Sequence, residues 1–92
     1  MELLFKVQEA LYIKSEGFVV VGNNPEWTIE DCSKMNVKGK SIIIRTSDGD
    51  YTFEVENLNV SISFTGKPNI GIRLKESDDF DKISKGDMIF KL

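Results

Sequence analysis

Residues 51–64, YTFEVENLNVSISF, decide the fold of this chain, because apolar and polar side chains alternate along almost the whole stretch. Such alternation is typical of β-strands that have one buried face and one exposed face. The alternation changes parity once, at Glu56-Asn57-Leu58, so the chain must bulge or bend there if both apolar sets are to reach a common core. The stretch therefore predicts two extended segments in a small closed β-structure.

Patterns on either side of this stretch predict further strands. Residues 3–13 alternate imperfectly, with a parity change near Glu9-Ala10, and their length fits a strand that crosses a barrel corner. Asp48-Gly49 is a favoured pair for a hairpin loop. Besides the two segments within 51–64, the expected strands are 3–13, 18–21, 41–46, 70–74 and 88–92. The prediction is about seven strands and no long helix.

Five glycines stand where the backbone is expected to make special demands. Gly17, Gly39, Gly66 and Gly86 fall at predicted chain reversals, where glycine adopts a positive φ at no steric cost. Gly71 interrupts a predicted strand, where we expect a neighbouring backbone or a bulky side chain to come close. These glycines shape the predicted barrel and do no chemistry.

Two segments lack a strand pattern. In residues 27–35, Thr28 and Asp31 fit the loose form of a helix capping box, but aspartate is shorter than the glutamate or glutamine that reaches back best. No clear helical stripe follows, so we expect a loop with at most one helical turn. Residues 75–85 are expected to form an acidic loop with a short helical turn.

Size and composition indicate one domain that spans residues 1–92. A chain of 92 residues can bury a single core without stabilising cross-links. Its contents of 40% hydrophobic and 29% charged residues are near globular averages. The longest apolar run has four residues, so no membrane span is expected. The first residues carry an acid, Glu2, where a secretion signal has bases. We expect a cytoplasmic location.

The chain has one cysteine, Cys32, and no histidine. An internal disulfide is thereby excluded, and a metal site built from nitrogen and sulfur ligands is not expected. Because no imidazole is present to activate it, Cys32 is expected to be an ordinary small side chain rather than a nucleophile. We expect no cofactor.

Some carboxylates stand close together in the sequence, as they do in acid–base or hard-cation sites. These are Asp48 with Asp50, and Asp78, Asp79 and Asp81. A hairpin turn and a solvated loop explain the same residues, because aspartate is a favoured turn residue. We therefore expect no enzymatic activity.

A net charge of −3 argues against a general surface for polyanions, which requires clustered lysine and arginine. A local basic patch is the alternative, formed by Lys34, Lys38 and Lys40 with Lys67 and Arg73 as possible neighbours in space. The competing interpretation is that these residues solvate turns and protect sheet edges.

The chain has a single tryptophan, Trp27, beside Ile29 in the expected loop. Tryptophan is strongly enriched in binding hot spots, so this loop is a candidate contact surface for a protein partner. The alternative is that Trp27 folds down and plugs one mouth of the barrel, because an aromatic side chain of that size dominates a small core.

The order of these segments resembles the second domain of translational GTPases of the elongation-factor Tu type. The matching stretches are Leu4-Phe5-Lys6-Val7, Leu11-Tyr12-Ile13, Gly17-Phe18-Val19-Val20-Val21-Gly22, Val37-Lys38-Gly39-Lys40-Ser41-Ile42-Ile43-Ile44, Tyr51-Thr52-Phe53-Glu54-Val55-Glu56-Asn57-Leu58, Asn69-Ile70-Gly71-Ile72-Arg73-Leu74 and Ile83-Ser84-Lys85-Gly86-Asp87-Met88-Ile89. The resemblance covers nearly the whole chain and implies a closed or partly open Greek-key β-barrel of about six to seven strands.

The chain also departs from this family. It has no glycine-rich phosphate-binding loop, so nucleotide hydrolysis is not expected. Residues 23–35 are longer than the connection the family has there, and loops carry specificity in such barrels. Association with RNA or the ribosome, which the resemblance implies, is therefore the alternative hypothesis for the function. We expect a noncatalytic binding or regulatory module for a protein partner, either a monomer or a weak oligomer.

Overall fold

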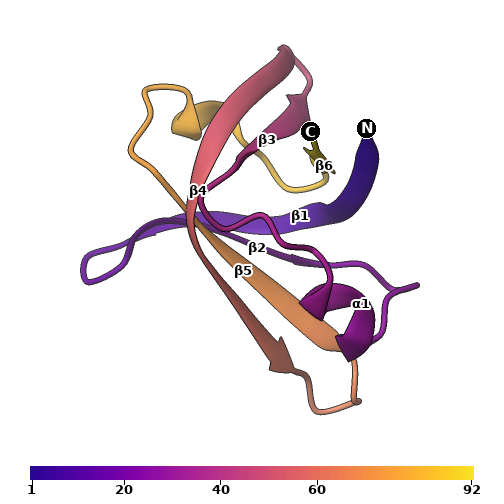
Figure 1. Cartoon of the computed structure of the whole chain (residues 1–92). Helices are drawn as coiled ribbons and strands as arrows, with labels where there is room; N and C mark the ends of the chain where they lie inside the picture. The colour runs from indigo at the N-terminus through magenta and orange to yellow at the C-terminus, as the bar shows by residue number, and fades with distance from the viewer.

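The computed structural model describes all residues from Met1 to Leu92 and contains six antiparallel strands that close into a barrel (Figure 1). The strands are β1 (Glu2–Ile13), β2 (Gly17–Asn23), β3 (Ser41–Thr46), β4 (Gly49–Ile62), β5 (Pro68–Leu74) and β6 (Met88–Lys91). Around the ring their order is β1-β2-β5-β4-β3-β6. Strand β6 returns beside β3 after the β3-β4-β5 meander, which is Greek-key connectivity. The predicted all-β barrel is confirmed.

Strand β4 contains the predicted parity change and bends at it (Figure 1). Its first half pairs with β3 and its second half with β5, and the register with β5 shifts between Val55 and Asn57. The bulge is thus confirmed. The two predicted segments form one long strand that has a different partner in each half, and so the barrel has six strands rather than seven.

The expectation that both apolar sets reach a common core is confirmed for the first half of β4 and only in part for the second half. Phe53 and Val55 in the first half are buried, with 2% exposure each. In the second half only Leu58 and Val60 touch the core, while Ile62 is 62% exposed and the following Phe64 is fully exposed. The end of the β4–β5 hairpin extends beyond the packed interior, so no other element covers its apolar face.

Strand β1 bulges twice. Its register with β2 shifts between Val7 and Glu9, close to the predicted position, and its register with β6 shifts between Leu3 and Phe5. The second shift lets Leu4 and Phe5 both be buried although they are consecutive. An added residue on one strand increases local twist, which helps the sheet to close on itself.

The glycines at the predicted reversals all have positive φ, from 79° to 95°. The close approach expected at Gly71 is absent: a Cβ built there would meet only the backbone oxygen of Asn59, at an ordinary 3.8 Å. The close approach is instead at Gly22 in β2, where a Cβ would lie 2.1 Å from the backbone oxygen of Lys6 and 2.5 Å from the ring of Phe5. The expectation for Gly71 is therefore wrong.

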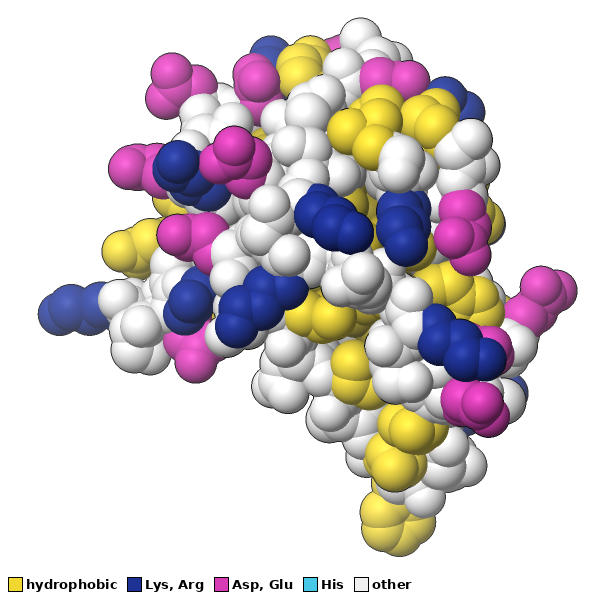
Figure 2. Space-filling model, in the orientation of Figure 1, with side chains coloured by type: hydrophobic (Ala, Val, Ile, Leu, Met, Phe, Trp, Pro, Cys, Tyr) yellow, Lys and Arg dark blue, Asp and Glu magenta, His cyan; other side chains and the backbone are white.

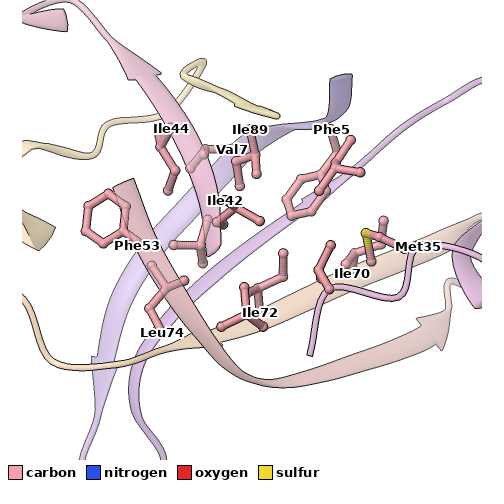
Figure 3. Packing of buried hydrophobic residues seen from close by; sticks show 14 of the residues in the cluster. Phe5, Val7, Met35, Ile42, Ile44, Phe53, Ile70, Ile72, Leu74 and Ile89 are labelled. Carbon is pink, nitrogen blue, oxygen red and sulfur yellow. The ribbon is translucent and has the colours of Figure 1, made fainter. Parts of the chain in front are cut away.

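The core is a cluster of sixteen buried side chains inside the ring. Figure 3 shows many of them pointing toward one another from different strands, namely Phe5, Val7, Ile42, Ile44, Phe53, Ile70, Ile72, Leu74 and Ile89. Burying each such side chain contributes about 1.5–3 kcal/mol relative to leaving it exposed. No polar or charged side chain is buried with them.

Two short helices lie in the segments that lack strand patterns. Helix α1 (Ile29–Ser33) lies beside β4 and β5, and η1 (Phe80–Lys82) is a 3-10 turn within the acidic loop. Both helical turns were predicted, although α1 slightly exceeds one turn. Neither is long and apolar enough to cross a membrane.

Candidate functional site

Helix α1 begins at a complete capping box. The Oγ1 atom of Thr28 accepts a hydrogen bond from the backbone N–H of Asp31 at 3.3 Å, and the backbone N–H of Thr28 donates to Oδ2 of Asp31 at 2.9 Å. The latter bond is the largest cause of a lowered pKa of the Asp31 carboxyl. The short side chain of Asp31 is therefore long enough to bond to the backbone of Thr28. This capping box starts a helix in a segment where no apolar stripe indicated one.

Trp27 stands just before this helix and combines parts of both predicted roles. Its side chain is half-buried and packs against the core cluster. It also lines a shallow hollow at the surface together with Glu2 and Lys34. The barrel end is filled more completely by Cys32 and Met35, which are only 1% and 3% exposed. Trp27 therefore rests on this plug with part of its surface still open.

The other apolar candidate, Ile29, lies on the first turn of α1 and is 43% exposed. The Cys32 thiol on the same helix faces the core instead. Burial, and next the negative charge of Asp31, raise the pKa of this thiol. Both effects disfavour the reactive thiolate.

The basic candidates lie among acidic residues. The Nζ atom of Lys34 lies 3.5 Å from Oε1 of Glu30 on α1. Lys38 and Arg73 line a common hollow on the barrel wall, but they share it with Glu54 and Glu56. Lys40 and Lys67 are exposed and line no part of that hollow. Figure 2 shows the resulting mixture of lysine, arginine and acidic side chains on one face.

The acidic candidates lie in turns or in an ion pair: Asp48 is in the β3–β4 turn, Asp78, Asp79 and Asp81 are in the turn and helix at η1, and Asp50 is paired with Arg45. Asp50 accepts hydrogen bonds from Nε and Nη2 of Arg45 at 2.9 and 3.2 Å. Arg45 and Asp50 are paired directly opposite each other in the β3–β4 ladder. The Arg45 guanidinium lowers the pKa of the Asp50 carboxyl. Gly49 beside it has a φ of 130°, which suits glycine at a hairpin. No group of three or more potential metal-ligating acids or cysteines is present.

Two surface features were not predicted. The first, the apolar tip, consists of Ile62 and Phe64 at the end of the β4–β5 hairpin; Figure 2 shows hydrophobic side chains reaching the end of the molecule where this hairpin lies in Figure 1. The polar residues Ser63 and Thr65 beside Phe64 were the signal that this segment meets solvent. The second is a hollow of about 260 Å³ on the outer face of β2, β5 and β4, around Gly71.

We compared the chain with models of protein families, with curated proteins and with solved structures, and no match was found in any of the three. The kinship with the second domain of translational GTPases therefore stays a prediction from the sequence.

Proposed function

We propose that the chain is a noncatalytic binding module that docks a protein partner on the apolar tip. The observation that carries this proposal is the exposure of Ile62 (62%) and Phe64 (fully exposed). Ile62 is the last residue of β4, and Phe64 follows in the turn that the hydrogen bond from Gly66 to Ser63 closes, so both side chains lie at the end of the hairpin. Isolated exposed apolar residues are common, but two large neighbours at a projecting hairpin end favour a contact surface.

The tip is held in place by backbone hydrogen bonds. The N–H of Ser63 donates to the carbonyl of Lys67 at 2.7 Å, and the N–H of Gly66 donates to the carbonyl of Ser63 at 2.9 Å. Because the turn is already ordered, a partner that covers Phe64 loses less conformational entropy than one that must order a loose loop.

The surroundings of the tip favour a protein over RNA. Covering each of the two side chains contributes about 1.5–3 kcal/mol of apolar burial, enough to anchor a small interface. Helix α1, which contacts both β4 and β5, carries a further exposed apolar side chain, Ile29. Phosphate binding would instead require clustered positive charge, whereas the chain has a net charge of −3.

A capture experiment from a native cell extract tests the proposal. The unmodified chain and an Ile62→Ser/Phe64→Ser double variant are immobilised side by side. Leu92→Ser is the matched control, because Leu92 is 64% exposed and the chain end lies at the opposite end of the molecule from the hairpin (Figure 1). Proteins retained by the unmodified chain and the control but lost by the double variant are the expected result.

Equal capture by the double variant and the unmodified chain would refute the proposal, provided that circular dichroism confirms equal folding. The substitutions are at exposed positions, where changes usually alter the free energy of unfolding by less than about 0.5 kcal/mol. Sedimentation of the purified chain adds a second readout: concentration-dependent self-association that the double variant abolishes would identify the partner as a second copy.

A further inference from the structure

The hollow around Gly71 is built from three neighbouring strands. Because Ile70, Ile72 and Leu74 of β5 point into the core, the alternate residues Gly71 and Arg73 point outward. In the ladder, Arg73 lies between Val19 of β2 and Asn57 of β4, and Gly71 lies between Val21 of β2 and Asn59 of β4. The hollow is thus a pit in a continuous sheet surface, walled by two valines, two asparagines and an arginine.

Gly71 makes the floor of this pit, although the fold does not require glycine there. Its φ lies outside the positive range, and a Cβ would meet no atom closer than 3.8 Å. Glycine within a strand is less stable than alanine, and it often marks a place where a ligand approaches the backbone. A side chain at this position would occupy part of the hollow.

Arg73 supplies a cation that the chain itself leaves unpaired. Its Nε atom is buried and has no hydrogen-bond partner, and no carboxylate oxygen lies within 4.0 Å of its guanidinium. The nearby Lys75 differs in this respect, because its Nζ atom is 3.3 Å from Oε2 of Glu54. No side chain or carbonyl of the chain accepts a hydrogen bond from this guanidinium, so the donors that it presents to the hollow are free for an incoming acceptor.

We propose that the Gly71 hollow binds a carboxylate carried on a short apolar body. The carboxylate accepts hydrogen bonds from the Arg73 guanidinium, for which a planar two-oxygen group is the natural partner. The apolar body lies over Gly71 against Val19 and Val21, and the side-chain amides of Asn57 and Asn59 flank it. The size is suitable, because a cavity of about 150 Å³ accommodates benzene and this hollow measures about 260 Å³.

The charges around the hollow favour one carboxylate over a polyanion. Glu16 lines the Gly71 hollow itself. Arg73 also lines the separate hollow on the barrel wall that contains Glu54 and Glu56. One arginine among these acids offsets a single negative charge, whereas a phosphate chain would meet repulsion from them. The carboxylate can belong to a free small acid or to the C-terminus of a peptide.

Nuclear magnetic resonance titration of the whole chain distinguishes these sources. The probes are isovalerate, its neutral amide isovaleramide, and the peptide acetyl-Gly-Val-Val with a free or an amidated C-terminus. We expect a dissociation constant on the order of 1 mM for the carboxylates, with backbone shifts centred on residues 19–21, 57–61 and 69–73. Binding of isovalerate identifies the free acid as sufficient, and binding of the free peptide alone identifies a chain end.

Substitutions test the two features that carry the proposal. Gly71→Val fills the pit and Arg73→Gln removes the cation, and each is expected to weaken binding roughly tenfold or more. Lys40→Gln is the control, because it removes a positive charge outside the hollow. Arg73→Lys keeps the charge without the planar fork and is expected to bind more weakly than the unmodified chain.

Four results would overturn the proposal: no saturable shifts with either carboxylate up to about 20 mM, equal binding of the neutral amides, unchanged binding by both Gly71→Val and Arg73→Gln, or inorganic phosphate acting on the same residues as strongly as isovalerate. Circular dichroism of each variant excludes loss of folding as the cause of lost binding.

Discussion

Replacing Gly22 by alanine places a methyl carbon 2.1 Å from the backbone oxygen of Lys6 and 2.5 Å from a ring carbon of Phe5. Ordinary contacts begin near 3.4 Å, so the methyl group is about 1.3 Å too close to the oxygen. The oxygen belongs to the backbone of β1 and has no rotamer through which to move away. Relief requires β1 and β2 to separate where they pair, beside the fully packed Phe5.

The expected cost of Gly22→Ala is at or above the upper end of the roughly 1–3 kcal/mol that overpacking a core usually costs. A domain of this size has a free energy of unfolding of about 5–14 kcal/mol, so the loss is a large fraction of it. With a urea dependence of about 1.5 kcal/mol per M, a loss of about 3 kcal/mol lowers the unfolding midpoint by roughly 2 M.

Gly71→Ala is the matched control, because Gly71 pairs with Val21, the residue before Gly22, in the β2–β5 ladder and an added Cβ meets nothing closer than 3.8 Å. Alanine suits a strand better than glycine, so we expect an unchanged midpoint or a gain of up to about 1 kcal/mol. Urea unfolding followed by circular dichroism measures both variants. Equal midpoints for Gly22→Ala and the unmodified chain, or equal losses in both variants, would refute the assignment of the close approach to Gly22.

Four further outcomes are expected. The Thr28 backbone N–H and the Arg45 guanidinium hold the pKa values of Asp31 and Asp50 below the ordinary aspartate value of 3.8 in the folded chain, so their contribution to stability is present above that pH and is lost as pH falls through the folded values. Acid titration of the unfolding midpoint should therefore show a smaller loss in an Asp31→Asn/Asp50→Asn variant. A thiol reagent should modify Cys32 slowly in the folded chain and quickly in urea, and equal rates would contradict its burial. Ile72→Ala should cost about 2–5 kcal/mol in chemical denaturation, because it leaves a cavity in the core. Acrylamide should quench Trp27 fluorescence to an extent between that of a free and a shielded indole, and full shielding would contradict its partial exposure.

The strands themselves could be predicted from the sequence. β3 has the predicted bounds, and the bulge in β4 lies at the predicted change of parity. Both depend on the alternation of neighbouring side chains, which chain geometry imposes locally. The capping box was also visible in the sequence, but whether Asp31 would close it depends on local geometry that residue types alone do not specify.

The candidate surfaces could not be predicted in the same way. Ile62 and Phe64 have the same pattern as Phe53 and Val55, yet only the latter pair is covered. The unpaired guanidinium of Arg73 and the open floor at Gly71 result from side chains on β2 and β4, which are distant in sequence. The surroundings of the basic residues were equally invisible in the sequence, because Lys34 and Lys38 are only four residues apart but line different hollows.

The sequence by itself determined which segments are extended, which residues share a face of each strand, and where β4 must bend, because these properties follow from the two-residue period of an extended chain. Only the tertiary structure decided that β4 pairs with β3 in one half and with β5 in the other, and that the ring closes through β6 and β1. It also decided which apolar faces are covered and which meet solvent. Coverage depends on elements brought together from distant parts of the chain, and a local pattern carries no information about which element will lie over it.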